Sequence, residues 1–317
     1  MKLSRHRRRV DVRGSLLGVL VALAFVACGG APRVETGKSE REAVAAAAQE
    51  QTPMPRRIIS LSPSTTEVLW GVGAFPRVVA VSDYDDFPPE VKDLPKIGGW
   101  SNTNLEQVAS LKPDLVVMTG AQAPFVKDKL EALGARTLVV ADRTLSDALN
   151  AITQIGAAAG EDGAAQKLLA ETRAKLDGVR AQTGNLARPR VLCVVDRVPG
   201  TLRGLYAATG GSFFAELIGI AGGESIAPAS PNGFGQISKE AVATLDPEII
   251  IDMVQSSNTG KLAEDPKAVW GELSRVNAVR TGRVFAVRDT SVLHPSQRVG
   301  DTARKFAEMI HPEAFGK

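Results

Sequence analysis

Glu161–Thr183 reads EDGAAQKLLAETRAKLDGVRAQT, a polar segment that contains no proline. Small and apolar residues recur along it at helical spacing: Ala164, Leu168, Thr172, Leu176 and Val179. Gly160 precedes the segment and Gly184 follows it, and glycine is common at helix ends. The pattern predicts one helix. About 23 residues at ~1.5 Å each would span roughly 35 Å, the width of a small domain.

The sequences on either side of this helix share a phrase. Asn104–Met118 reads NLEQVASLKPDLVVM, and Ser238–Asp252 reads SKEAVATLDPEIIID. Each predicts a short amphipathic helix, a turn with proline and an acidic residue, and a buried β-branched strand. A looser echo pairs Ser64–Gly73 with Ser212–Gly222. The sequence therefore predicts an α/β fold in which two related lobes, each with a central sheet, are joined by one long linker helix.

Composition suits a globular protein of two domains, with 317 residues of which 44% are hydrophobic and 23% charged. The formal net charge of +3 is misleading, because residues 1–27 hold six of the Lys and Arg and only one Asp. Without them the chain has 32 basic and 34 acidic residues. No basic surface for a nucleic-acid partner is expected.

The N-terminus has the pattern of an export signal. A basic stretch is followed by an apolar run, residues 15–27, that is too short to span a bilayer. The order Phe25-Val-Ala-Cys28 resembles a bacterial lipobox, which implies a signal peptide over 1–27 and a lipidated Cys28. The alternative is an ordinary signal peptide cut nearby. We expect an exported protein, on the periplasmic or cell-surface side, anchored to the membrane by Cys28.

Five segments are predicted in all. Residues 1–27 are the signal peptide and 28–56 a flexible tether rich in Ala, Glu and Gln. The N-terminal lobe is 57–160, the linker helix 161–184 and the C-terminal lobe 185–317. Cys193, in a buried strand, is the one cysteine left after Cys28 and is assigned no chemistry.

Aromatic residues are scarce, and several fall in loops where a ligand would bind. Tyr84 follows the strand predicted at 78–81, and Trp100 stands in a Gly-Gly-Trp loop. Ligands of α/β folds bind at the carboxyl ends of strands. Phe234 lies between two glycines. The local alternative is that these rings pack on their own loops; the functional one is that they stack on a flat or bulky ligand.

Other polar residues have competing interpretations. His294 and Arg298 lie just beyond a predicted strand. Each could form local hydrogen bonds or contact a ligand, and His294 could also form an axial bond to a metal centre in the ligand. Ser64 with Glu67, and Thr103 with Glu106, both match the S/T-x-x-E capping box. For Glu67 we favour local capping.

Three stretches together resemble a known family: Ser60–Ala74, Val81–Val117 and Leu217–Ala227. They are similar to the substrate-binding proteins of bacterial ABC importers for vitamin B12, ferric siderophores and haem. The resemblance covers Arg57 to the C-terminus. It implies two α/β lobes bridged by a single long helix, a ligand cleft between the lobes, and delivery of the ligand to a membrane permease.

Within the family, the phrase Asp-Tyr84-x-Asp-aromatic-Pro-Pro followed by Gly-Gly-Trp100 most resembles the cobalamin-binding members. The resemblance implies that Tyr84 and Trp100 pack on a corrin ring, and that Tyr206, Phe234 and Arg298 lie near contacts made by the second lobe. A family tryptophan after the 115–118 strand is Thr119 here. The choice among corrinoid, ferric siderophore and haem therefore stays open.

The resemblance also implies a partner. Glutamates at the positions of Glu106 and Glu224 are implied to sit on the outer tips of the lobes and dock onto arginines of the permease. We expect a monomer that binds a small metal chelate as its ligand, with no resident cofactor, no metal site of its own and no nucleic-acid partner.

Three other functions fit the sequence less well. A lipid-anchored hydrolase would need a nucleophile and a base. The chain has only three histidines, of which His6 lies in the predicted signal peptide, and it has no G-x-S-x-G or P-loop motif. A metal-ion receptor would need converging His and carboxylate ligands. A purely structural lipoprotein would not need the loop aromatics. Each is disfavoured.

Overall fold

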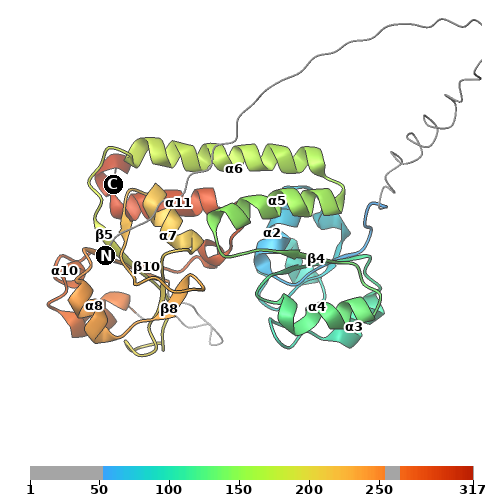
Figure 1. Ribbon diagram of the computed structural model, residues 1–317, viewed down its shortest axis with the longest axis horizontal. Helices are drawn as coiled ribbons and strands as arrows, with labels where there is room; N and C mark the ends of the chain where they lie inside the picture. Colours follow the sequence, from blue (N-terminus) through green and yellow to red (C-terminus); the bar gives the residue numbers. More distant parts are fainter. Residues whose placement is uncertain (1–52, 254–264, 317) are drawn as a thin grey trace, which may run out of the picture. The chain divides into compact units, whose positions relative to one another are not determined.

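The computed structural model describes residues 53–253 and 265–316, which belong to one compact unit. The predicted signal peptide, Cys28 and nearly all of the predicted tether lie outside the described residues. The described part contains two α/β lobes and a long helix that joins them (Figure 1). The fold class predicted from the sequence is confirmed.

The sheet of the N-lobe has four parallel strands in the order β2-β1-β3-β4. These are β1 (Ile58–Ser60), β2 (Val78–Ala80), β3 (Leu115–Thr119) and β4 (Thr137–Val140). Four α-helices connect and cover them: α2 (Pro63–Gly71), α3 (Leu105–Leu111), α4 (Ala123–Ala132) and α5 (Leu145–Ala159). Both faces of the sheet are buried, which is why the strands are continuous apolar runs rather than alternating ones.

Helix α6 (Asp162–Thr183) is the predicted linker, and Figure 1 shows it running along both lobes with α5 and α11 against it. Its N-terminal end is fixed to the N-lobe, because Arg77 binds Glu161 at 2.6 Å and Gly156 of α5 packs directly on Ala165. A Cβ on Gly156 would lie 2.2 Å from that of Ala165, so only glycine fits.

The C-terminal end of α6 is fixed to the C-lobe. The Thr183 hydroxyl donates to the Ile220 carbonyl at 2.7 Å, and Lys175 pairs with Asp301 of α11 at 2.8 Å. The buried positions of α6 are Ala165, Thr172, Leu176, Val179 and Thr183. The predicted Ala164 and Leu168 are only partly buried, because the helix turns slightly different faces to its two lobes.

The sheet of the C-lobe is mixed, in the order β10-β9-β5-β6-β8 with β7 paired to β5. Its strands are β5 (Arg190–Asp196), β6 (Tyr206–Ala208), β7 (Glu224–Ser225), β8 (Phe234–Gln236), β9 (Ile249–Met253) and β10 (Val284–Val287). Strands β6 and β8 run antiparallel to their neighbours. These short strands follow glycine-containing loops, and the sequence did not predict them.

Five helices cover this second sheet: α7 (Phe213–Ile220), α8 (Lys239–Leu245), α9 (Pro266–Trp270), α10 (Asn277–Arg280) and α11 (Val299–Ile310). Helices α7 and α11 pack on one side with the linker, around Phe214 and Phe306. Buried Trp270 anchors the other side. Among the described residues, no helix has the length and apolar character needed to cross a membrane.

The repeated phrase folds in the same way in both lobes. Helices α3 and α8 have N-caps at Asn104 and Ser238, whose side chains accept the backbone N–H three residues on. Both helices end at a left-handed residue, Lys112 (φ 48°) and Asp246 (φ 42°), and a five-residue strand follows each. The repeat therefore has the same length, caps and exit geometry in each lobe.

Neither predicted capping box forms. The N-cap of helix α2 is Ser62, two residues before the Ser64 of the predicted box; its side chain makes no cap, and the carboxylate of Glu67 points to the other lobe. Before α3, Thr103 donates to the Gly99 carbonyl, and Asn104 takes the N-cap position instead. Proline at N1 of α2 and asparagine before α3 satisfy the helix starts better than the predicted residues.

Candidate ligand-binding site

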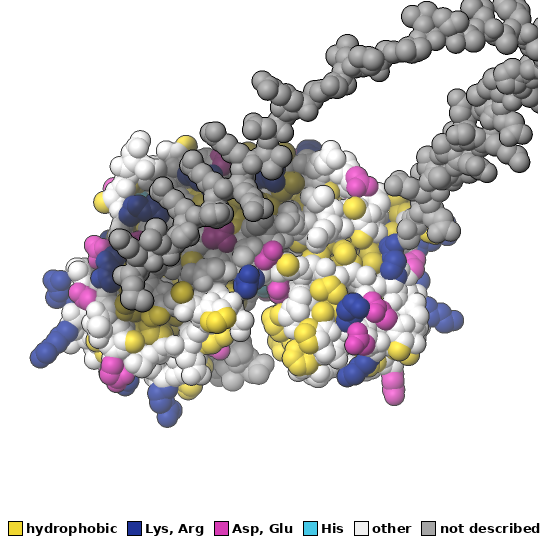
Figure 2. Space-filling model, viewed as in Figure 1, with side chains coloured by type: hydrophobic (Ala, Val, Ile, Leu, Met, Phe, Trp, Pro, Cys, Tyr) yellow, Lys and Arg dark blue, Asp and Glu magenta, His cyan; other side chains and the backbone are white. Residues whose placement is uncertain are grey.

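The two lobes meet through contacts at two places. At one, the Arg143 carbonyl, just after β4, accepts the Phe213 N–H at 2.8 Å, and the Arg143 guanidinium donates to the Pro231 carbonyl at 3.2 Å. At the other, Thr290 donates to Asp86 at 2.7 Å. Figure 2 shows a hollow between the lobes with hydrophobic side chains on both walls. This hollow is the cleft of the molecule.

On the N-lobe wall, the loops that carry Tyr84 and Trp100 are tied together. Asp83 and Gly98 form two hydrogen bonds. The Asp83 N–H donates to the Gly98 carbonyl at 3.0 Å, and the Asp83 carboxylate accepts the Gly98 N–H at 3.1 Å. The Tyr84 ring lies against Gly99, where a Cβ would come within 2.9 Å of it. The glycines thus let two aromatic loops pack closely. Tyr84 and Trp100 nonetheless stay 59% and 46% exposed.

On the C-lobe, Tyr206 and Phe234 lie on adjacent strands and stack with their centroids 6.3 Å apart and their planes 13° apart. Phe214 meets Phe234 edge-on and fixes it from below. Tyr206 pairs with Asp196 at the carboxyl end of β5. The loop before Phe234 contacts Arg143 of the N-lobe through Pro231. The pair therefore stands near the junction with the first lobe.

Exposed apolar side chains concentrate at the carboxyl ends of the central strands. Eight large hydrophobic residues are exposed in the described part of the chain, and five follow or flank such strand ends: Tyr84, Trp100, Phe125, Val198 and Tyr206. The sequence prediction missed Phe125, in the first turn of α4 after β3, and Val198, after β5. Their position directly after buried strands was the available signal.

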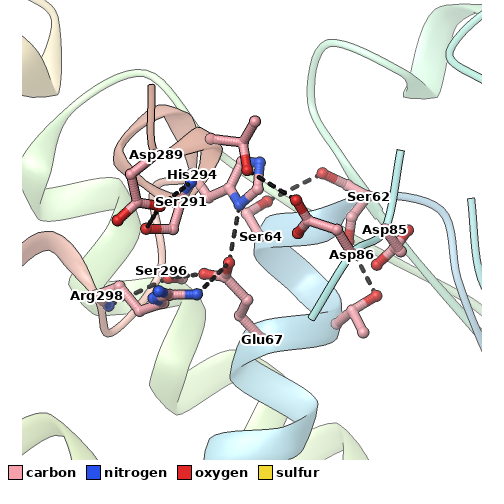
Figure 3. A network of polar contacts seen from close by, with 12 residues as sticks. Ser62, Ser64, Glu67, Asp85, Asp86, Asp289, Ser291, His294, Ser296 and Arg298 are labelled. Carbon is pink, nitrogen blue, oxygen red and sulfur yellow. Dashed lines mark hydrogen bonds and ion pairs between the residues drawn. The ribbon is translucent and has the colours of Figure 1, made fainter. Parts of the chain in front are cut away.

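His294 and Arg298 meet across the lobe junction on one carboxylate, that of Glu67 (Figure 3). His294 Nδ1 lies 2.8 Å and Arg298 Nη1 lies 3.4 Å from Glu67 Oε1. Ser296 donates to the other carboxylate oxygen at 2.5 Å. Since the structure gives Glu67 contacts to the C-lobe rather than to its own helix start, the local capping that we favoured for it is wrong.

Asp85 is a second buried carboxyl group beside the cleft, in the same loop as Tyr84. Burial raises its pKa from 3.8 to about 6, although hydrogen bonds from Ser82 and Thr66 and the charge of Lys96 act in the opposite direction. Its Oδ2 accepts the Ser82 N–H at 2.9 Å. Among the described residues, no group of three or more His, Cys, Asp or Glu side chains could hold a metal ion.

A separate hollow of about 460 Å³ opens at the amino ends of the C-lobe strands, lined by Arg188, Glu248, Arg283 and His311 among others. It is lined by no aromatic residue and lies at the opposite end of β5 from Tyr206. We therefore place the ligand site in the cleft, where the exposed rings gather.

The two predicted docking glutamates, both exposed, do not occupy matching places. Glu106 lies in the first turn of α3, beside the cleft loops. Glu224 pairs with Arg190, the first residue of β5, about 20 Å from the carboxyl end of that seven-residue strand. The residue that matches Glu106 is Glu240, in the first turn of α8, which follows β8. The last residue of β8, Gln236, pairs with Tyr206, and Tyr206 pairs with Asp196 at the carboxyl end of β5.

Comparison with known proteins decides the family. The model of the periplasmic binding protein family matches residues 58–290. The chain belongs to this family. Periplasmic binding proteins are non-enzymatic components of ABC importers, so this chain is an extracytoplasmic substrate-binding protein and not an enzyme.

Curated relatives match most of the length of this periplasmic binding protein. An uncharacterized ABC transporter substrate-binding lipoprotein of Bacillus subtilis, YvrC, is 28% identical over 98% of this chain and 99% of its own. The vitamin B12-binding protein of Vibrio campbellii is 29% identical over 80% and 88%.

Solved structures share the fold. The vitamin B12-binding protein BtuF of Vibrio cholerae is 24% identical, with a TM-score of 0.69, over 83% of this chain and 99% of its own. The haem-binding protein RhuT of Roseiflexus sp. RS-1 is also 24% identical, with a TM-score of 0.71, over 82% and 99%. At this identity the two structures establish the two-lobed fold, and they do not select a ligand.

Proposed function

We propose that this periplasmic binding protein captures a corrinoid in the cleft and delivers it to a membrane permease. The observation that carries the proposal is the set of exposed rings, Tyr84 and Trp100 on one lobe and Tyr206 on the other, at the carboxyl ends of the central strands. Large flat apolar surfaces of this kind fit a flat, bulky ligand. The vitamin B12-binding relatives support the same ligand class.

The charges beside the cleft favour a corrinoid over haem. Near the strand ends, Arg197 is paired with Asp252 and Arg298 with Glu67, while Lys96 and Arg143 donate to the backbone carbonyls of Asp85 and Pro231. Asp83 and Asp86 of the cleft loop are exposed. Haem carries two carboxylates that need cations, whereas a corrinoid carries neutral amides that can donate to carboxylates.

The test is a calorimetric panel of cyanocobalamin, haemin and a ferric hydroxamate siderophore on the purified chain. We expect cyanocobalamin to bind most tightly. Each ring contributes ~1 kcal/mol beyond its buried area, so Tyr84→Ala with Trp100→Ala should weaken binding by roughly tenfold or more. Leu133→Ala, an equally exposed apolar residue at the far end of α4, is the control. Tighter binding of haemin or the siderophore would reassign the ligand.

For docking to the permease we propose Glu106 with Glu240 as its partner, in place of the expected Glu224. The two residues occupy the same position of the repeated helix. Hydrogen bonds from the backbone N–H of Glu240 and from the Ser238 hydroxyl lower the pKa of the Glu240 carboxyl group, so this group is charged. Figure 1 shows α3 and α8 on the side away from the linker helix, so one flat partner could meet both.

Two double variants separate the candidates. Glu106→Ala with Glu240→Ala should abolish most ligand-dependent stimulation of the permease ATPase, while Glu106→Ala with Glu224→Ala should act no more strongly than Glu106→Ala alone. Exposed ion pairs contribute only about 0.2–1 kcal/mol each, so the effect is on orientation and encounter rate. Ligand affinity should be unchanged in all of them. The reverse ranking would restore Glu224.

We also propose that Cys28 carries a lipid anchor, supported by its lipobox-like context and by the lipoprotein relative. Several acyl chains hold a protein at a membrane where one chain does not. Cys28→Ser should move the protein from the membrane fraction to the soluble fraction or leave it unprocessed. An unchanged membrane fraction would show that Cys28 is not the anchor.

A further inference from the structure

Glu67 is the most completely buried charged group that joins the lobes. It lies on α2 of the N-lobe with none of its side chain exposed. Its carboxylate can only accept, so the neighbouring His294, Ser296 and Arg298 groups all donate to it. The backbone carbonyl of Glu67 accepts a further bond from the Gln297 amide at 2.8 Å. All four donors belong to one short C-lobe segment, residues 290–298.

The same segment also holds the loop that carries Tyr84. Thr290 donates to Asp86 at 2.7 Å, and the Arg298 guanidinium lies 4.9 Å from the centre of the Phe87 ring. Asp86 and Phe87 follow Tyr84 in the loop 82–88. Figure 3 shows Asp86, His294 and Glu67 grouped at this junction. A displacement of the segment 290–298 would therefore displace the aromatic loop.

The segment is itself fixed to the C-lobe. Asp289 accepts the Ser291 N–H at 3.0 Å and its hydroxyl at 2.6 Å, and it pairs with Lys305 of α11. Arg298 is the residue at the start of α11. The segment therefore moves with the C-lobe, and Glu67 is the fully buried one of the N-lobe residues that hold it, beside the exposed Asp86.

We propose that Glu67 is a positioning residue for ligand binding: it fixes the angle between the lobes and, through the segment 290–298, the loop of Tyr84. The ligand part of this inference rests on the proposed function. A buried carboxylate needs all its donors, so a neutral amide in its place would lose part of this set and leave Arg298 without its counter-charge. A cleft that is no longer pre-organised binds more weakly.

The test compares Glu67→Gln with two controls in the full chain carrying Cys28→Ser. Glu216→Gln changes an exposed glutamate of α7 that also bonds across the junction, to the Leu145 N–H at 3.1 Å. Asp252→Asn changes a buried carboxylate that binds Arg197 and Trp270, both within the C-lobe. The first control shows whether changing any glutamate that bonds across the junction has the same effect. The second control shows whether losing any buried ion pair has the same effect.

The first readout needs no ligand. Spin labels at Ala109→Cys and Ala243→Cys, equivalent exposed positions of α3 and α8, report the distance between the lobes. Burial raises the pKa of the Cys193 thiol and keeps it from being labelled. We expect a broadened distance distribution for Glu67→Gln and an unchanged one for both controls. A narrow distribution for Glu67→Gln, or equal broadening in Asp252→Asn, would overturn the proposal.

The second readout is affinity for the ligand identified by the calorimetric panel. Glu67→Gln should lower it by about five- to twentyfold, mainly through a faster off-rate, with little effect from Glu216→Gln. If the wild-type chain binds none of the panel, the proposed function fails, and the distance measurement still decides the role of Glu67. Should Glu67→Gln not fold, Ser296→Ala, which removes one donor, must broaden the distances; unchanged distances would overturn the proposal.

Discussion

Asp85 makes the stability of this protein depend on pH in an unusual direction. Burial raises its folded-state pKa from 3.8 to about 6, so the folded chain holds a proton that the unfolded chain releases. Stability from this group is then highest below pH 4 and falls as the pH rises from about 4 to 6. The difference between these two pKa values corresponds to at most about 3 kcal/mol of unfolding free energy.

Asp85→Asn should remove this dependence, because the amide carries no charge at any pH. Between pH 4.5 and pH 7 the unfolding free energy of the variant should improve relative to wild type by about 2 kcal/mol. Urea denaturation at the two pH values measures it. Asp128→Asn, at a fully exposed position of α4, is the control. Parallel pH profiles for wild type and Asp85→Asn would contradict the prediction.

Single residues were also where sequence reasoning reached its limit. Tyr84 and Trp100 could be singled out, because strand ends and glycines are visible in the sequence. Glu67 could not be, because its partners lie 227–231 residues further along the chain. The apparent capping box with Ser64 explained Glu67 locally, although the contacts of its side chain are with residues far along the chain.

At the scale of elements, the repeated helices α3 and α8 both end at a non-glycine residue in the left-handed conformation. This conformation costs an L-residue roughly 1–2 kcal/mol. Asp246 has a compensating contact, since its carboxylate accepts the Asn277 N–H at 2.7 Å. For the side chain of Lys112 the structure gives no such contact.

Lys112→Gly should therefore raise the unfolding free energy by about 0.5–1 kcal/mol, the relief of strain less the added freedom of the unfolded chain. Asp246→Gly should not, because it loses the bond to Asn277. Thermal unfolding of the two variants makes the comparison, with Lys112→Ala as a control that keeps the strain. An equal gain at both positions would contradict this account.

Elements with strong periodicity were predictable, and short irregular ones were not. The sequence pattern predicts strands over 137–140, 249–253 and 284–287 and a helix over 145–159. The bounds of β4, β9, β10 and α5 agree with these ranges, because each is an uninterrupted apolar or amphipathic run. The strands β6 and β8 have three residues each and are stabilised by pairing with each other and with β5. Such strands are determined by tertiary contacts rather than by local sequence.

At the scale of the whole described unit, the linker helix is fastened to both lobes and leaves little room for hinge motion. Close packing of Gly156 on Ala165 and the ion pair of Arg77 with Glu161 fix one end. The contacts of Thr183 and Lys175 fix the other. The cluster around Glu67 adds a third attachment on the cleft side.

Ligand binding should therefore shift the distance between labels at Ala109→Cys and Ala243→Cys by less than about 2 Å, the scale of helix shifts rather than of hinge closure. Pulsed electron paramagnetic resonance with and without ligand measures the shift. Gly156→Leu, which separates α5 from α6, should enlarge it. A large closure in the wild-type chain would show that the linker bends.

The position of Glu67 in the chain also determines the order in which the molecule can be completed. The sheet of the N-lobe is made entirely from residues 58–140, so it can assemble early in synthesis. The buried Glu67 carboxylate of this lobe, however, acquires its hydrogen-bond donors only after His294, Ser296 and Arg298 have been made. A chain cut shortly before residue 290 would hold every strand and helix of its first lobe and still lack the groups that neutralise that lobe's interior. The maturation of the first lobe thus depends on the last part of the protein to be made.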